Sequence, residues 1–235
     1  MSFGCRLAST TTNTLIAVVL SAALPAFAPA QSSSSAFSAA QAHVPQKTRN
    51  EKSILDAGSV NAGVYRNTPF GFSCIVPAGW VLRTDEMNAR ADGSNTGKAG
   101  NSTDKASRVL LAAFSRPPEA RAEDVNASIL IAAESVASYP GLSEAAQYFG
   151  PVTEIAKARG FATAEEPYEF AVGTKMLVRG DFQKDVGTRR MLQSTLVMLS
   201  RGYAISFTFI GGTEDEVDEL IAGLSFGGGT KPHSH

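Results

Sequence analysis

Histidine is scarce in this 235-residue chain, and none of the three histidines falls among its apolar stretches. His43 lies in a serine- and alanine-rich segment, while His233 and His235 stand at the end. A Ser-His-Asp or Cys-His site needs an imidazole that packed structure holds at hydrogen-bond distance. Two cysteines are also too few for a structural zinc site. We therefore predict no catalytic residues, no metal ligands and no cofactor, and a protein that is not an enzyme.

Charge is likewise low and balanced. The net charge is −1, charged residues make up 18% of the chain, and no run of five like charges occurs. Nucleic acid binding requires a concentrated basic face, so this class of function is excluded.

Long hydrophobic runs are missing except for one near the N-terminus, from Leu15 to Leu24. Arg6 precedes it, and Ala28-Pro29-Ala30 follows with the small residues that signal peptidase recognises. We predict a signal peptide over residues 1–30, cleaved after Ala30, and an exported protein that is periplasmic or secreted. Because the run is short and has no counterpart downstream, no stable membrane span is expected after cleavage.

Loss of the signal peptide would leave Cys74 as the single cysteine, so an internal disulfide is excluded. Cys74 lies within the stretch from Phe70 to Trp80, in which Phe70, Phe72, Cys74 and Val76 alternate with small polar residues. This period of two predicts a strand with one face in a core. Pro77 ends the strand. The alternation favours a buried, inert thiol over a reactive one.

The rest of the chain divides around that strand. We predict a flexible leader over 31–62, one domain over 63–226, and a disordered tail over 227–235. Residues 85–107 are polar and glycine-rich, which predicts a long loop, either a tolerated insertion or a functional flap.

Within 63–226 the spacing of apolar residues predicts strands, a helix, more strands and a last helix. The first helix spans 142–159 and is broken at Gly150-Pro151. Two strands are expected over 161–164 and 168–172, and the cleanest apolar alternation is Tyr203 to Phe209. Thr213 and Glu216 form the signature of a helix start. The fold class is α+β, an antiparallel sheet of six or seven strands packed with helices as an α/β/α sandwich.

This order of elements, with Phe70-Gly71-Phe72 leading to Pro77-Ala78-Gly79-Trp80, resembles the PsbP-like α/β sandwich superfamily. That superfamily includes the PsbP subunit of photosystem II, a Ran-binding import factor and exported bacterial proteins of the DcrB and LpqN types. The resemblance covers about 63–226. It implies a non-enzymatic accessory, assembly or binding protein, and it transfers no catalytic residues.

Carboxylate groups are the remaining candidates for chemistry. They are Asp85-Glu86, Glu165-Glu166 and Glu214 to Glu216, and all are interpreted as surface charge or as charge at a helix start. Asp92 to Asn95 lacks the ligand spacing of a calcium loop. Gly223 to Gly227 matches Gly-x-Ser-x-Gly but follows a helix and has no acid or packed histidine after it, which argues against a nucleophile elbow.

Three functions therefore stand in order. The leading hypothesis is an exported, non-enzymatic binding protein that contacts a protein of the cell envelope. The first alternative is a carrier of a small apolar ligand or lipid held between sheet and helix, with the 203–209 face as lining. In the simpler interpretation, the apolar face of residues 203–209 is part of the hydrophobic core and lines no ligand site. The second alternative is a hydrolase that uses carboxylates only. No ligand-binding residue is assigned from the sequence.

Overall fold

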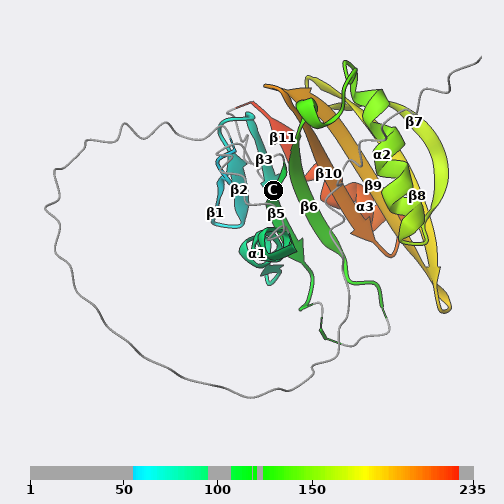
Figure 1. The fold of residues 1–235 in the computed structure, drawn as a ribbon. Helices are drawn as coiled ribbons and strands as arrows, with labels where there is room; N and C mark the ends of the chain where they lie inside the picture. The colour runs from blue at the N-terminus through cyan, green and yellow to red at the C-terminus, as the bar shows by residue number, and fades with distance from the viewer. Residues whose placement is uncertain (1–54, 95–106, 118, 121–123, 228–235) are drawn as a thin grey trace, which may run out of the picture.

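The structure is a computed structural model, and it describes residues 55–94, 107–117, 119–120 and 124–227 (Figure 1). The predictions for the signal peptide, the three histidines and the tail beyond Gly227 lie outside these residues. No helix within the described ranges has the length and apolar content that a membrane crossing requires.

Seven antiparallel strands form the large sheet. Their order across the sheet is β4 (Val81–Leu82), β5 (Ser107–Phe114), β6 (Ser128–Ser135), β10 (Tyr203–Gly211), β9 (Arg189–Ser200), β8 (Lys175–Val186) and β7 (Ala162–Val172). The hairpin between β9 and β10 turns at Arg201-Gly202, both with positive φ, as a tight two-residue connection requires. The predicted α+β class and strand number are confirmed.

A second, four-stranded sheet was not predicted. Its order is β1 (Ser59–Asn61), β2 (Val64–Asn67), β3 (Phe72–Ile75) and β11 (Leu224–Phe226). The strand expected around Cys74 is β3. Phe72 and Cys74 of β3, and Phe70 and Val76 on either side of it, are all buried, as predicted.

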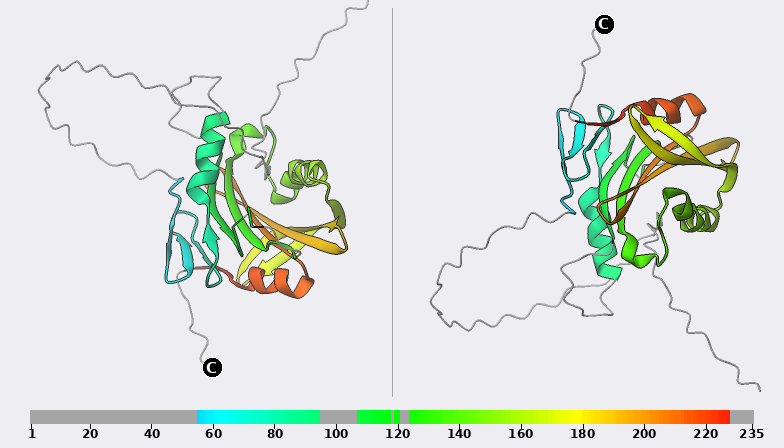
Figure 2. Two further views of the ribbon diagram at one scale, coloured as in Figure 1. Left: turned by 90° about the horizontal axis from the view of Figure 1, so that it is seen from below. Right: turned by 90° about the horizontal axis from the view of Figure 1, so that it is seen from above.

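The helices and the small sheet cover both faces of the large sheet (Figures 1 and 2). We call one side the α3 face: its apolar residues pack against the small sheet and α3 (Glu214–Ala222). The other is the α2 face, on which α2 (Phe149–Ala158) packs after two short 3₁₀ turns, η1 (Val136–Ser138) and η2 (Ala145–Tyr148). Helix α1 (Thr84–Ser94) lies along β5.

Helix α1 corrects the prediction of a loop over 85–107. It is not strongly amphipathic, so the apolar pattern does not reveal it. Its polar side chains instead satisfy the backbone of β5 where the two-residue β4 leaves it unpaired. Asn88 bonds both the N–H and the C=O of Val109, and the Thr84 hydroxyl accepts the N–H of Ala112. Residues 95–106 lie outside the described part of the chain.

The leader boundary at residue 62 is also wrong, because order begins by Leu55, which is 5% exposed. Two buried side chains of β2 hold this segment. The Tyr65 hydroxyl donates to the Ala57 carbonyl, and the Asn67 amide donates to the Asp56 carbonyl. These tertiary bonds leave no mark on the periodicity of residues 55–61.

Two smaller predictions change. The helix break precedes Gly150, and Pro151 lies in the first turn of α2, where the missing N–H costs nothing. The strands expected over 161–164 and 168–172 are one strand, β7, bulged on either side of Glu165.

Candidate functional site

The α2 face carries an open pocket between the large sheet and α2, which we call the α2-face groove. Its volume is about 110 Å³. Its apolar wall comes from α2, and Val109 of β5 also lines it. Its floor comes from β6, β9 and β10 and mixes polar with apolar residues. The polar ones are Glu134, Gln193, Thr195, Ser206 and Thr208, and the apolar ones are Leu130, Ile131, Ala132 and Ile210.

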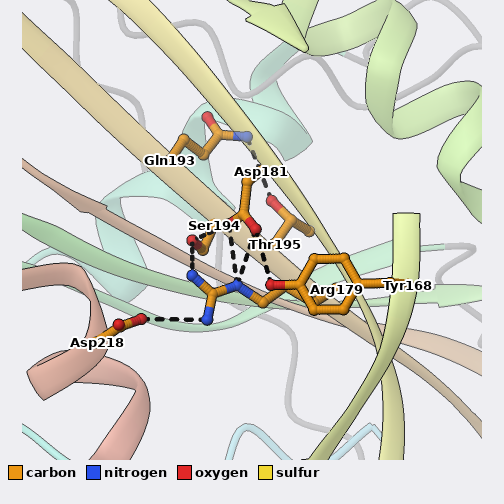
Figure 3. Close-up of polar contacts among 7 residues, drawn as sticks. All are labelled: Tyr168, Arg179, Asp181, Gln193, Ser194, Thr195 and Asp218. Atoms are coloured by element: carbon orange, nitrogen blue, oxygen red, sulfur yellow. Dashed lines mark hydrogen bonds and ion pairs between the residues drawn. The ribbon is translucent and has the colours of Figure 1, made fainter. Parts of the chain in front are cut away.

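The floor exists because β9 and β10 place polar residues side by side. Thr195 lies directly opposite Thr208 in the register, and their hydroxyl oxygens are 3.1 Å apart. The Gln193 amide donates to the Thr195 hydroxyl at 3.3 Å (Figure 3). Gln193 and Thr195 are 7% and 1% exposed, so this polar ladder sits in an otherwise apolar sheet. Buried polar groups need such partners to avoid a desolvation cost.

One end of the groove is acidic and aromatic. The Tyr139 hydroxyl donates to the Glu134 carboxylate, and the rings of Tyr139 and Tyr148 meet edge-on at 5.3 Å. Burial, together with the neighbouring Glu134, raises the pKa of both tyrosine hydroxyls. Both therefore stay protonated at neutral pH and act as hydrogen-bond donors.

The opposite end of the groove is basic. Arg159 caps the C-terminus of α2 and also lines the pocket. Burial lowers the pKa of its guanidinium. Tyr148 and Arg159 bracket a ten-residue helix, a length of about 15 Å. The groove thus differs in charge from one end to the other.

A second polar cluster lies on the α3 face (Figure 3). Arg179 donates to the Asp181 carboxylate at 3.0 Å, to Asp218 of α3 at 3.1 Å and to Ser194 at 3.1 Å. The Tyr168 hydroxyl donates to Asp181, and burial, with that carboxylate, raises the pKa of Tyr168 to about 12.

The cluster joins β7, β8 and β9 to α3. A hollow of about 320 Å³ adjoins it, with Arg179 and Asp218 in its wall. Because Arg179 is already bonded to two carboxylates and stacks 5.1 Å from the Phe170 ring, the cluster serves to hold α3 on the sheet.

Comparison with known proteins adds a likeness of fold. No family model matches the chain, and no curated protein matches it in sequence. Among solved structures it is similar to cyanobacterial PsbP (CyanoP) from Synechocystis sp. PCC 6803, at 15% identity and a TM-score of 0.41, over 72% of this chain and 96% of that one. It is also similar to the Ran-binding protein Mog1p of Saccharomyces cerevisiae, at 12% identity and a TM-score of 0.38, over 72% and 96%.

A third similar structure, from Bacteroides thetaiotaomicron, has 12% identity and a TM-score of 0.35 over 74% of this chain; the chain spans half the length of that protein. CyanoP is thus among the solved structures that the chain is similar to, and the likeness is one of fold alone.

The carboxylates considered from the sequence do not meet in one site. Glu86 pairs with Arg83 and Arg90 along α1, and Glu165 and Glu166 are exposed on β7. Glu214, Asp215 and Glu216 form the first turn of α3, where the Thr213 hydroxyl caps the Glu216 N–H and Glu216 accepts the N–H of Gly212. Among the described residues no group of three or more His, Cys, Asp or Glu is placed to hold a metal.

The other candidate residues named from the sequence have structural roles in the fold. Ser225 lies in β11, and its hydroxyl is 2.9 Å from that of Ser73, so the Gly-x-Ser-x-Gly match is not a nucleophile elbow. Cys74 is fully buried, and burial raises the pKa of its thiol to about 12. The alternating face of β10 is core: Ile205, Phe207 and Phe209 have no exposed surface.

The groove residues were missed by sequence reasoning. A signal was present, because Gln193, Thr195, Ser206 and Thr208 interrupt strongly apolar strands at every second position. What the spacing does not reveal is that Thr195 of β9 lies opposite Thr208 of β10, and that Ser206 and Thr208 stay partly exposed beside α2.

Proposed function

We propose that the chain is an exported, non-enzymatic binding protein that acts through contact with a protein of the cell envelope, and that it holds this partner in the α2-face groove. The observation that carries the proposal is the composition of the groove: an apolar helix wall and a floor in which hydroxyl, amide and carboxylate groups stand among apolar residues. Those polar groups can bond the backbone and side chains of a partner protein.

The two alternatives have less support. The carrier of an apolar ligand loses its expected lining, because the aromatic residues of β10 are buried against the small sheet. A carboxylate-only hydrolase needs two carboxyl groups facing one substrate. Glu134 is the one carboxylate among the described residues of the groove lining, and a tyrosine already bonds it.

The test is a pulldown from the envelope fraction at several salt concentrations with the full chain and two matched variants. Ser206→Phe fills the groove, while Ser225→Phe adds the same ring to the exposed outer side of the small sheet. We expect wild type and Ser225→Phe to retain the same partner and Ser206→Phe to lose it, with all three melting cooperatively. A partner retained equally by Ser206→Phe, or no specific partner at any salt concentration, overturns the proposal.

Export has its own measurement. N-terminal sequencing of the protein recovered from the producing cells is expected to begin at Gln31. A start at Met1 or Ser2 contradicts cleavage after Ala30.

A further inference from the structure

We infer that the α2-face groove receives the ammonium end of a lysine side chain presented by the partner protein, with Glu134 as the group that recognises it. This inference rests on the proposed function and names the chemistry of the contact. It follows from the size of the groove, from the lack of a cationic partner for Glu134 among the described residues, and from the unused hydrogen-bonding capacity of the floor.

Size and polarity match a lysine side chain. A cavity of about 150 Å³ holds one benzene, which has six heavy atoms. The groove, at about 110 Å³, has room for roughly four or five heavy atoms on the same scale. Lysine has four methylenes and one nitrogen, and it buries its stem along apolar surface while the charged head reaches a polar group. Val152, Ile155 and Ala156 of α2 provide such a surface.

Glu134 lacks a cationic partner. It is half-buried, and no Lys or Arg among the described residues forms an ion pair with it. The hydroxyls of Tyr139 and Tyr148 occupy part of its capacity, but a carboxylate offers about four lone-pair sites. A charge-assisted bond from an ammonium is among the stronger contacts available to a partly desolvated carboxylate.

Arg159 lines the same groove but follows the last residue of α2, whereas Tyr148, beside Glu134, precedes the first. A lysine ammonium is therefore favoured at the Glu134 end, where the acidic group lies.

The paired hydroxyls of Thr195 and Thr208 favour a peptide ligand over a free amine. Each hydroxyl carries one hydrogen, so when Thr195 and Thr208 bond each other, one of the two hydrogens stays available to an outside acceptor. An alkylammonium has donors only. A peptide that carries lysine also brings backbone carbonyls, which can accept that hydrogen.

The experiment is an NMR titration of the ¹⁵N-labelled full chain with three probes. Acetyl-Gly-Gly-Lys-Gly-Gly-amide is the ligand, the same peptide with norleucine removes only the ammonium, and n-butylammonium tests a free amine. We expect the lysine peptide to shift the amide signals of Glu134, Ser206 and Thr208. The norleucine peptide is expected to bind at least about tenfold more weakly, since it lacks the charge-assisted bond. In E134Q, the lysine peptide is expected to fall to the norleucine level.

Equal binding of the two peptides, no shift with any probe, or unchanged lysine binding in E134Q overturns the inference. Saturation by n-butylammonium without any effect of the lysine peptide also overturns it, because the ligand is then a free amine. These outcomes differ from failure of the proposed function, which is read from the pulldown. If Ser206→Phe loses the partner in the pulldown while the lysine and norleucine peptides bind equally, the proposed function stands. The inference that a lysine occupies the groove is then wrong.

Discussion

The ring of Phe72 meets the ring of Phe207 edge-on, with the centroids 4.9 Å apart and the planes at 83°. Phe72 comes from the small sheet and Phe207 from the centre of the large one. Both are buried, and Phe226 of β11 packs against both rings. This aromatic cluster joins the two sheets.

Removing either ring is expected to destabilise the whole fold. Phe72→Ala and Phe207→Ala should each lower the free energy of unfolding by about 3–5 kcal/mol, because both the apolar contact and the packing are lost. The double variant should reveal a coupling of about 0.5–1.5 kcal/mol. Urea unfolding measures these changes. Ile75→Ala, on the same strand but 56% exposed, is the control and should change stability by less than about 1 kcal/mol.

Gly180 leaves room for the Phe149 ring between α2 and the sheet. A Cβ at this position would lie 2.4 Å from Cε1 of Phe149, so Gly180→Ala must displace that buried ring. We expect a loss of about 1–3 kcal/mol and weaker binding of the lysine peptide. A Cβ on Gly150, in the same turn, meets nothing within 4 Å. Gly150→Ala should therefore be neutral or slightly stabilising, and equal effects of the two variants would contradict this role of Gly180.

The two carboxylates bonded to Arg179 should differ in importance. The Asp181 side chain is 19% exposed and that of Asp218 is 61% exposed. Asp181→Asn is expected to cost about 1.5–3 kcal/mol, since it weakens charged hydrogen bonds to Arg179, Tyr168 and Ser194. Asp218→Asn should cost less than about 1 kcal/mol because its ion pair is largely solvated. Chemical denaturation of both variants measures the change in the free energy of unfolding. A larger loss of stability in Asp218→Asn than in Asp181→Asn would contradict this prediction.

Cys74 should resist thiol reagents in the folded protein. With a pKa of about 12, only about one thiol in 10,000 is ionised at pH 8, and the side chain is also buried. In a Cys5→Ser background, labelling by a thiol reagent is expected only after denaturant is added. Because the thiolate fraction rises with pH, any slow native labelling should accelerate as the pH is raised towards 12. Rapid native labelling at pH 7 would show an accessible, activated thiol.

The sequence predicts well whatever depends on local periodicity. The buried face of β3, the strands that form the centre of the large sheet and the capped start at Thr213 all follow from residues that are near one another in the chain. Such patterns report burial against some surface but do not say which surface. For this reason the alternation around Cys74 predicts a strand of one single sheet, whereas β3 belongs to a second sheet.

What sequence reasoning misses depends on distant partners. Helix α1 is held by Thr84 and Asn88 bonding the backbone of β5, about twenty-one to twenty-eight residues away. The groove depends on Thr195 facing Thr208 across two strands and on Glu134 standing beside Tyr139. None of these pairings alters the apolar spacing, so the fold class was accessible from the chain and the candidate site was not.

The pairing of β3 with β11 carries a consequence for how the protein is made. Ser73 meets Ser225 across 152 positions, so one edge of β3 stays without its neighbour until β11 has been synthesised. The small sheet is thus completed only after every strand of the large sheet has left the ribosome, which makes its closure a late event in the folding of a nascent chain.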